Sequence, residues 1–294
     1  EKTRAAVARR ARGQLSPLRA FDVTWAAGRT DLADGLRLER ESFLELRGSD
    51  QAAALRHAFF AERAVSKLPE LKGVEPRPLE NLAVIGGGTM GAGITVAMLD
   101  AGFAVTLLER DGEALHRGLA NVERIYDSAV RKGRLDEGGK EHRLSRLTPT
   151  TEYEELADRD LVIEAVFEEM SVKHEVFRKL DAVMKPGAIL ATNTSYLDVD
   201  EIAAATRRPG DVLGLHFFSP ANIMKLMEVV QGAETRDDVL ATGFALARKL
   251  RKVSVLSGVC DGFIGNRILM TYRRHADFLL EDGCLPHEVD AAMR

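Results

Sequence analysis

The chain has 294 residues, of which 45% are hydrophobic and 29% charged, a composition typical of globular proteins. The formal net charge of −4 argues against a nucleic-acid partner, and no uninterrupted apolar run is long enough to span a bilayer. The two cysteines, Cys260 and Cys284, predict no disulfide framework. They favour a reducing compartment such as the cytosol, with the peroxisome or the mitochondrial matrix as alternatives.

Residues 1–34 show little periodicity, and we assign them no role. The chain begins with Glu1 and is basic after it, which allows a transit peptide; an exposed helix from a longer polypeptide is favoured because serine is scarce. In residues 35–67 the apolar side chains fall mostly at helical spacing, with a break near 48–50, so we predict two amphipathic helices. The prolines and glycine of residues 71–78, LKGVEPRP, predict a linker.

Residues 82–111 form the stretch around which the rest of the chain is organised. An apolar run, 82–85, leads into glycines in the order G-x-G-x-x-G, followed by an apolar helical run and a second apolar strand that ends at Glu109. This is the strand–turn–helix–strand unit that binds dinucleotides. A glycine-rich turn without a ligand is the alternative, but the strands and the helix around the turn favour dinucleotide binding.

Each glycine of this turn has a predicted role. Gly86 lets the chain turn sharply, Gly88 leaves room for a pyrophosphate, and Gly91 lets the helix pack close to the strand. The N-terminus of the following helix offers free N–H groups and a positive dipole end, which favour phosphates. A carboxylate at Glu109 is placed to accept hydrogen bonds from ribose hydroxyls.

Helices and strands alternate after residue 109. We predict strands at 147–150, 161–166, 188–192, 212–216, 225–230 and 253–256. We predict helices at 113–131, within the charged segment 132–147, and at 171–184, 235–251, 264–281 and from 286 onward. The alternation predicts an α/β fold with a doubly wound, mostly parallel sheet of Rossmann type, covered by helices on both faces.

Polar residues follow the predicted strands, at the carboxyl ends where a doubly wound sheet binds its ligands. They are the glycine turn, Glu109, Glu168 with Lys173 nearby, Asn193 to Ser195, and His216. Any one of them could be a loop residue that faces water. Because five strand ends agree, we predict one site along this edge of the sheet, with no metal ligand in it.

His216 is the candidate base, because a histidine ring exchanges protons near neutral pH. A histidine satisfied within the core is the alternative. Glu228, however, interrupts the apolar run LMEVV, and an unpaired carboxylate there would be costly, so it needs a partner. His216 is the nearest plausible partner, and a carboxylate on one ring nitrogen would fix the tautomer. An ion pair of Glu228 with Lys225, or an exposed edge position, is the alternative.

Five motifs together resemble the L-3-hydroxyacyl-CoA dehydrogenase family, over roughly residues 79–294. They are VIGGGTMGAGI at 84–94, EAVFE at 164–168, NTSYL at 193–197, HFFSPANIMKLMEVV at 216–230 and DGFIGNRIL at 261–269. The resemblance implies NAD-dependent oxidation of an L-3-hydroxyacyl-CoA to a 3-ketoacyl-CoA in fatty-acid β-oxidation. The chain departs from the family pattern at Ser219, where many members have Asn, and at Glu109, where Asp is frequent.

The resemblance also implies roles for single residues. It makes His216 the base and Glu228 its partner, and it assigns Ser195 and Asn266 to the substrate oxygen and the site network. From the sequence alone, Asn266 could instead cap the long helix in whose first turn it lies. The implied cofactor-binding set is Gly86, Gly88, Thr89, Met90, Gly91, Glu109, Glu168, Lys173 and Asn193.

Residues 35–67 resemble the C-terminal tail of an enoyl-CoA hydratase domain, as fused in multifunctional fatty-acid oxidation enzymes. We therefore expect a hydratase-like remnant with a linker at 1–78, an NAD-binding Rossmann domain at 79–258, and the truncated start of a helical C-terminal dehydrogenase domain at 259–294. A homo-oligomer and an association with a thiolase subunit are the assemblies considered for the parent enzyme. The competing functions are an NAD-binding fragment or protein without turnover, and a dehydrogenase of short hydroxy acids.

Overall fold

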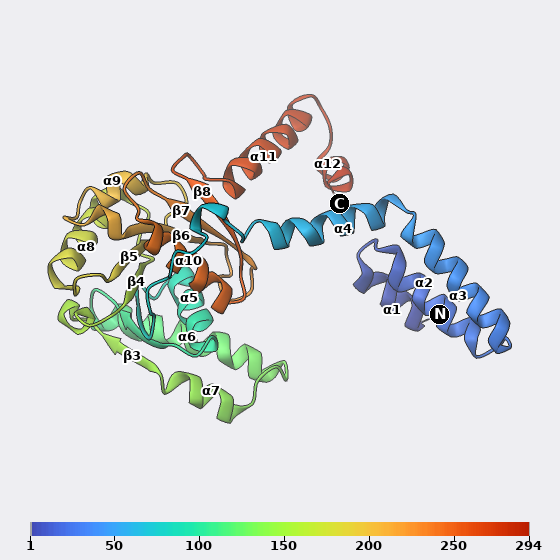
Figure 1. The fold of residues 1–294 in the computed structure, drawn as a ribbon, viewed down its shortest axis with the longest axis horizontal. Helices are drawn as coiled ribbons and strands as arrows, with labels where there is room; N and C mark the ends of the chain where they lie inside the picture. The colour runs from blue at the N-terminus through green and yellow to red at the C-terminus, as the bar shows by residue number, and fades with distance from the viewer. Residues whose placement is uncertain (1, 294) are drawn as a thin grey trace. The chain divides into compact units, whose positions relative to one another are not determined.

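The computed structural model describes residues 2–293 and divides after Lys67 into two compact units (Figure 1). The first unit is helical. Its helices are α1 (Lys2–Ala11), α2 (Leu15–Ala27), α3 (Leu32–Arg47) and α4 (Asp50–Ala64). The two helices predicted within 35–67 are confirmed as α3 and α4. Helix α1 lies in the basic N-terminal segment for which an exposed helix was favoured, whereas α2 was not predicted as a separate element.

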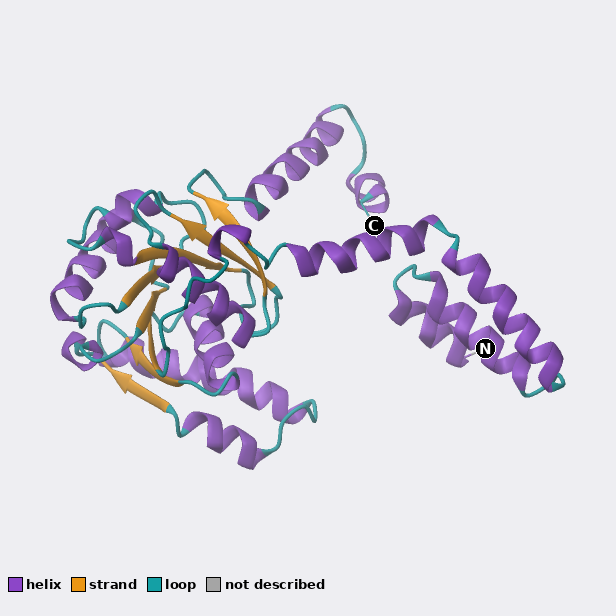
Figure 2. Cartoon of the chain, in the orientation of Figure 1, coloured by secondary structure: helices purple, strands orange, loops and turns teal. Residues whose placement is uncertain are grey.

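The second unit contains one eight-stranded sheet in the order β3-β2-β1-β4-β5-β6-β7-β8, drawn in orange in Figure 2. Its strands are β1 (Asn81–Ile85), β2 (Ala104–Leu108), β3 (Leu147–Thr150), β4 (Leu161–Glu164), β5 (Ile189–Thr192), β6 (Val212–Phe217), β7 (Leu226–Gln231) and β8 (Val253–Gly258). All neighbouring strands pair in parallel except β6 and β7, which are antiparallel. The predicted doubly wound, mostly parallel sheet is confirmed.

Helices cover both faces of this sheet (Figure 2). The helices of the second unit are α5 (Thr89–Asp100), α6 (Gly112–Arg131), α7 (Glu137–Leu144), α8 (Met170–Val183), α9 (Val199–Ala203), α10 (Asp237–Lys249), α11 (Gly265–Glu281) and α12 (Pro286–Ala292). The short α9 was not predicted, nor were the 3₁₀ turns at Pro69–Leu71, Tyr153–Leu156 and Pro209–Asp211, because such short elements show no measurable period. Within residues 2–293, no helix combines the length and the apolar character that a bilayer span requires.

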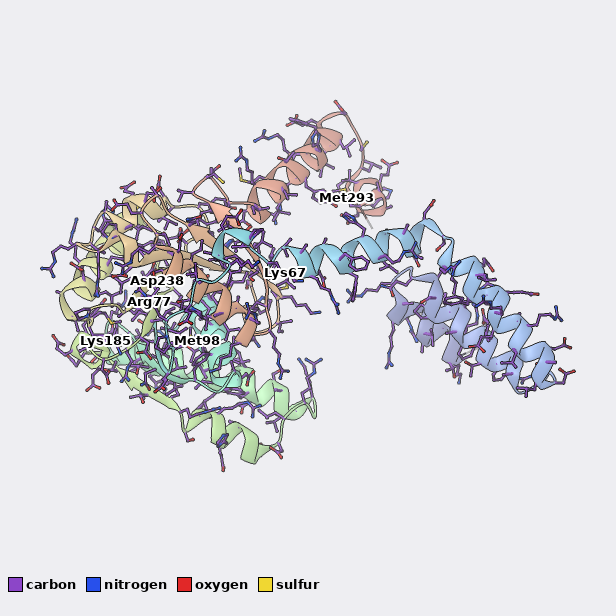
Figure 3. All side chains as sticks on the ribbon, viewed as in Figure 1. Lys67, Arg77, Met98, Lys185, Asp238 and Met293 are labelled. Atoms are coloured by element: carbon purple, nitrogen blue, oxygen red, sulfur yellow. The ribbon has the colours of Figure 1, made fainter. Side chains whose placement is uncertain are left out.

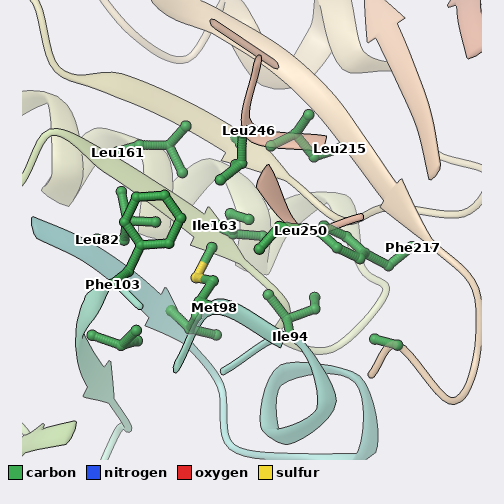
Figure 4. Packing of buried hydrophobic residues seen from close by; sticks show 14 of the residues in the cluster. Leu82, Ile94, Met98, Phe103, Leu161, Ile163, Leu215, Phe217, Leu246 and Leu250 are labelled. Carbon is green, nitrogen blue, oxygen red and sulfur yellow. The ribbon is translucent and has the colours of Figure 1, made fainter. Parts of the chain in front are cut away.

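Two hydrophobic clusters fix the orientation of the strands. Helices α5, α6 and α10 pack on one face of the sheet, and α8 and α9 on the other. Successive side chains of a strand point to opposite faces, so Leu215 and Phe217 of β6 join the first cluster, with Ile94 and Met98 of α5 (Figure 4). His216, between them, therefore points to the opposite face.

The linker predicted at 71–78 belongs structurally to the second unit. Arg77 donates hydrogen bonds at 2.8 Å to Asp238, to Asp211 and to the carbonyl of Gly187, and its side chain is largely buried (Figure 3). Its backbone N–H also donates to Thr242 at 2.8 Å. The break between the units lies after Lys67, whereas the predicted domain boundary lies at 78/79. Proline and glycine indicate an irregular backbone, but they do not show whether that backbone is free.

Candidate active site

The glycine-rich turn joins β1 to α5. Gly86 has a φ of +98°, and a Cβ on it would lie 2.6 Å from the carbonyl oxygen of Ala165. A Cβ on Gly91 would lie 1.7 Å from the carbonyl oxygen of Gly86, so only glycine lets α5 approach the strand so closely. A Cβ on Gly88 would meet no atom within 4 Å, so the turn is open on this side. The sharp turn at Gly86 and the close packing at Gly91 agree with the predicted roles.

The peptide groups of Gly87 are held from two elements. Its N–H donates to Glu109 Oε1 at 2.7 Å, at the end of β2, and its carbonyl accepts from Asn121 Nδ2 of α6 at 2.8 Å. A Cβ on Gly87 would lie 2.5 Å from the Cα of Gly118, so α6 packs directly on the turn. Gly87, Gly118 and Asn121 were not predicted; the only signal in the sequence is a third glycine within the turn.

The residues around the turn fit a dinucleotide. No side chain caps the N-terminus of α5, a twelve-residue helix, so its first N–H groups are available to phosphate oxygens. Gly88 leaves space in front of them, and Thr89 beside it is exposed. A cavity of about 310 Å³ lies next to the turn, lined by Gly87, Gly88 and Glu109 among others. The carboxylate of Glu109 therefore lines the cavity into which the ribose next to the bound phosphates would extend.

A buried ion pair stands at the end of β4. The Lys173 ammonium lies 2.7 and 3.0 Å from the two carboxylate oxygens of Glu164, and both side chains are at most 1% exposed. Glu164 also accepts from the Thr192 hydroxyl at 2.7 Å and from the Val166 N–H at 2.8 Å. Glu164 was not predicted, although it interrupts the apolar run LVIEAV just as Glu228 interrupts LMEVV.

Lys173 reaches the edge of the sheet through Glu168. Its ammonium is buried and lies 3.2 Å from Glu168 Oε2, so it is directed at two carboxylates rather than exposed along a cofactor. Glu168 Oε1 accepts from the Thr194 hydroxyl at 2.6 Å and from the Ser195 N–H at 2.7 Å. Partial burial alone would raise the pKa of Glu168, but the Thr194 hydroxyl, the Lys173 charge and the Ser195 N–H outweigh burial and hold this pKa below its usual range.

Asn193 connects the ends of two strands. It is buried, and its side-chain oxygen accepts from the Phe217 N–H at 2.8 Å. Asn193 follows β5 directly, and Phe217 ends β6. The predicted cofactor residue therefore also holds the strand that carries His216.

His216 and Glu228 face each other across the antiparallel pair β6 and β7. The register places them directly opposite, and His216 Nδ1 lies 2.6 Å from Glu228 Oε2, with both side chains buried. The predicted contact is therefore present, and the alternative pairing of Glu228 with Lys225 is not. Glu228 Oε1 accepts from the backbone N–H groups of Ile264 at 3.1 Å and Gly265 at 2.7 Å. One carboxylate thus holds both the imidazole and the start of α11.

Two aromatic rings flank the imidazole. The ring centroids of Phe218 and Phe263 lie 4.5 and 5.6 Å from that of His216. Phe263 has a φ of +48°, in a region that non-glycine residues rarely adopt, and it follows Gly262, whose φ is +68°. A Cβ on Gly265 would lie 2.7 Å from Phe218, so glycine is required there to keep this ring beside His216. None of these residues was predicted to flank the base.

Asn266 and Ser195 come together from distant parts of the chain. Asn266 lies in the first turn of α11, and its Nδ2 donates to the backbone carbonyl of Ser195 at 3.5 Å. Both residues are partly exposed. The network from Lys173 through Glu168 thus continues through Ser195 to Asn266, which is beside the residues that hold Glu228.

A larger cavity of about 660 Å³ lies between α5, α6 and the loop that follows β6. Its wall includes the loop residues Pro220, Asn222 and Ile223. The basic residues in its lining are Arg124, Arg131, Lys132, Arg134 and Arg143. Asp100 is the one acidic side chain among the described lining residues, so the cavity suits an anionic ligand.

Comparisons with known proteins agree with this geometry. Residues 81–260 match the family described as 3-hydroxyacyl-CoA dehydrogenase, NAD binding domain. The peroxisomal bifunctional enzyme of Cavia porcellus is 41% identical over 286 residues, which are 96% of this chain and 39% of that protein. The chain spans about two fifths of the length of the curated relatives that it matches.

Solved structures show the same fold. The (S)-3-hydroxybutyryl-CoA dehydrogenase PaaH1 of Ralstonia eutropha has a TM-score of 0.70 and 32% identity, covering 72% of this chain and 75% of that one. The dehydrogenase part of multifunctional enzyme 1 from C. elegans has a TM-score of 0.63 and 32% identity, covering 80% of this chain and 56% of that one.

Proposed function

The chain belongs to the 3-hydroxyacyl-CoA dehydrogenase family, and from this premise we propose that it oxidises an L-3-hydroxyacyl-CoA to the 3-ketoacyl-CoA with NAD⁺. The observation that carries the proposal is the buried pair of His216 and Glu228, 2.6 Å apart. The pair lies in the same sheet as a glycine-rich turn that fits a dinucleotide. A base and a hydride acceptor are the two groups that alcohol oxidation requires.

His216 acts as the general base in this proposal. With Nδ1 directed at the Glu228 carboxylate, the ring carries its proton on Nδ1, and Nε2 is free to accept the proton of the substrate hydroxyl. Glu228 fixes this tautomer and stabilises the imidazolium that forms. The Ile264 and Gly265 N–H groups hold the other carboxylate oxygen, so the pair has one orientation.

The cofactor is held by the residues of the turn and of the neighbouring strand ends. When bound there, NAD⁺ would supply the hydride acceptor for the carbinol carbon of the substrate. The N-terminus of α5 binds the phosphates, and Glu109 accepts from the ribose hydroxyls. Glu168 and Asn193 lie along the same edge and complete the proposed cofactor side.

Ser195 and Asn266 are proposed to contact the substrate oxygen, because Asn266 already lies against Ser195 at the edge of the sheet. The anionic phosphates of an acyl-CoA suit the basic cavity beside the β6–β7 loop. In this arrangement residues 79–258 bind the cofactor and also carry the base, Ser195 and the basic cavity, while residues from 259 onward add Asn266 to the substrate side.

Reduction of acetoacetyl-CoA tests the proposal directly. We expect the protein to oxidise NADH with this thioester, followed at the absorbance band of reduced nicotinamide, and to leave free acetoacetate unreacted as the matched control. Preference for the free acid would indicate a dehydrogenase of short hydroxy acids. NADH binding without turnover would indicate a nucleotide-binding protein and would refute the enzymatic proposal.

We expect NADH to bind more tightly than NADPH. The Glu109 carboxylate can accept from a free 2′-hydroxyl, whereas it would repel a 2′-phosphate. Glu109→Ser should reduce the difference in affinity between NADH and NADPH, because the exposed Arg110 beside it could then attract the 2′-phosphate. Fluorescence titration of both cofactors measures this, with Glu175→Ser, an exposed carboxylate paired with Lys179 on α8, as the control. Equal affinity of the unmodified protein for both cofactors would contradict the expectation.

We propose that the reaction takes place in a reducing compartment, either the cytosol or a peroxisomal matrix. The free thiols of Cys260 and Cys284 agree with both, and the curated relatives above include peroxisomal proteins. A homo-oligomer and a complex with a thiolase subunit are the two proposed assemblies. Analytical ultracentrifugation with and without a thiolase would distinguish them.

A further inference from the structure

The loop of residues 218–225 connects β6 to β7 and begins two positions after His216. The Ile223 and Met224 N–H groups both donate to the Pro220 carbonyl at 2.9 Å, so the middle of the loop forms a single helical turn. A Cβ on Gly93 of α5 would lie 3.2 Å from Ala221, so the loop packs closely on the helix that begins at the glycine turn. The loop therefore packs on α5 and, together with this helix, lines the basic cavity.

Lys252 holds this loop from the strand next to it. Its ammonium donates to the carbonyls of Ala221 and Met224, the latter at 2.7 Å. Lys252 directly precedes β8, and the Val253 N–H donates to the Lys225 carbonyl at 2.8 Å. The start of β8 is therefore hydrogen-bonded to the end of the loop, next to the point where the Lys252 side chain contacts it. No carboxylate among residues 2–293 forms an ion pair with this ammonium, which lies 5.9 Å from the centroid of the Phe217 ring, and burial lowers the pKa of Lys252. The half-buried Lys252 ammonium therefore donates directional, charge-assisted hydrogen bonds to two carbonyls of the loop.

We propose that Lys252 is a positioning residue that sets the shape of the acyl-CoA cavity by holding the loop 218–225. The proposal rests on the proposed function, because it names what the cavity binds. Lys252 acts through the loop and does not touch the reacting atoms. Without the ammonium, the carbonyls of Ala221 and Met224 lose a charged donor, and Pro220, Asn222 and Ile223 of the cavity wall lose their fixed place.

The expected consequence is specific for the substrate. Lys252→Met removes two hydrogen bonds from a charged donor, so the loop no longer holds the cavity wall in the conformation that binds the thioester. We therefore expect the KM for acetoacetyl-CoA to rise by about ten-fold or more. The dissociation constant for NADH should stay unchanged, since Lys252 donates its hydrogen bonds to Ala221 and Met224 and not to the glycine turn or Glu109. Lys252→Arg keeps the charge and should raise the KM less. Lys225→Met, which removes an exposed lysine of the same loop, is the matched control.

Three measurements decide the matter: steady-state kinetics, NADH titration, and hydrogen exchange of the amides in residues 218–225. We expect faster exchange confined to this loop in Lys252→Met, with a higher KM and unchanged NADH affinity. An unchanged KM, or an equal loss of NADH affinity, would overturn the role of Lys252 while leaving the proposed function intact. An unmodified protein that does not reduce acetoacetyl-CoA would overturn the proposed function and this role with it. If Lys252→Met does not fold, Lys252→Arg and the hydrogen-exchange comparison decide.

Discussion

Replacing His216 by glutamine is expected to lower kcat by about 10²–10⁴-fold and to leave NADH affinity unchanged. Glutamine fills similar space but cannot take up the proton of the substrate hydroxyl. The glycine turn and Glu109, which are proposed to hold the cofactor, make no hydrogen bond with His216. Steady-state kinetics with acetoacetyl-CoA and fluorescence titration with NADH separate the two effects. His142→Gln, at an exposed position on α7, is the control and should leave both quantities unchanged.

Glu228→Gln should cause a loss of similar size for a reason that the hydrogen bonds make specific. The Ile264 and Gly265 N–H groups can only donate, so they will face the amide oxygen of the new glutamine. Its NH₂ group will then point at His216 Nδ1, which must act as an acceptor. The ring proton is thereby moved to Nε2, the atom that has to accept the substrate proton. The base is present but in the wrong tautomer.

The double variant shows whether His216 and Glu228 act together or independently. Once His216 is glutamine, the tautomer that Glu228 selects no longer matters, so His216→Gln/Glu228→Gln should be little slower than either single variant. Losses that multiply across the two substitutions would show that the residues do not act as a pair. Unfolding curves for all three variants verify that the comparison is made between folded proteins.

Lys173→Met is expected to give the largest loss of stability among single substitutions at this edge of the sheet, about 3–5 kcal/mol. It leaves the Glu164 carboxylate fully buried without its cation, with only the Thr192 hydroxyl and the Val166 N–H as donors. Adding Glu164→Gln should restore part of this loss, because the double variant no longer buries an uncompensated charge. Failure of the second substitution to restore stability would contradict the explanation.

Chemical denaturation measures this prediction through the unfolding midpoint at constant slope. The only tryptophan, Trp25, lies in the first unit, so circular dichroism should follow the second unit rather than tryptophan fluorescence. Lys179→Met is a matched control on the same helix, since Lys179 pairs with Glu175 at 2.7 Å on an exposed surface. Exposed pairs contribute little, and the midpoint of this variant should stay within experimental error of the unmodified protein.

The sequence by itself determined the parts of this protein that depend on local pattern. Short apolar runs and helical periods predicted the strands of the sheet other than 147–150, LTPT, which has no apolar run, and glycine spacing predicted the dinucleotide turn. The charge interrupting LMEVV was enough to connect Glu228 with His216, because an unpaired carboxylate on a buried strand is too costly. The same reasoning, applied to LVIEAV, would have found Glu164. Its partner, Lys173, lies nine residues later in the first turn of the next helix.

Only the tertiary structure decided contacts between residues that strand order and helix packing bring together. Gly87 meets Gly118 and Asn121 because α6 packs on the turn; Glu228 meets Gly265, 37 positions later, because α11 begins beside β7. Lys252 reaches the loop after His216 because β8 pairs with β7. A local pattern reports which side of an element is buried, but not which element covers it. That choice follows from how the whole chain packs its apolar surface while each buried polar group finds a partner.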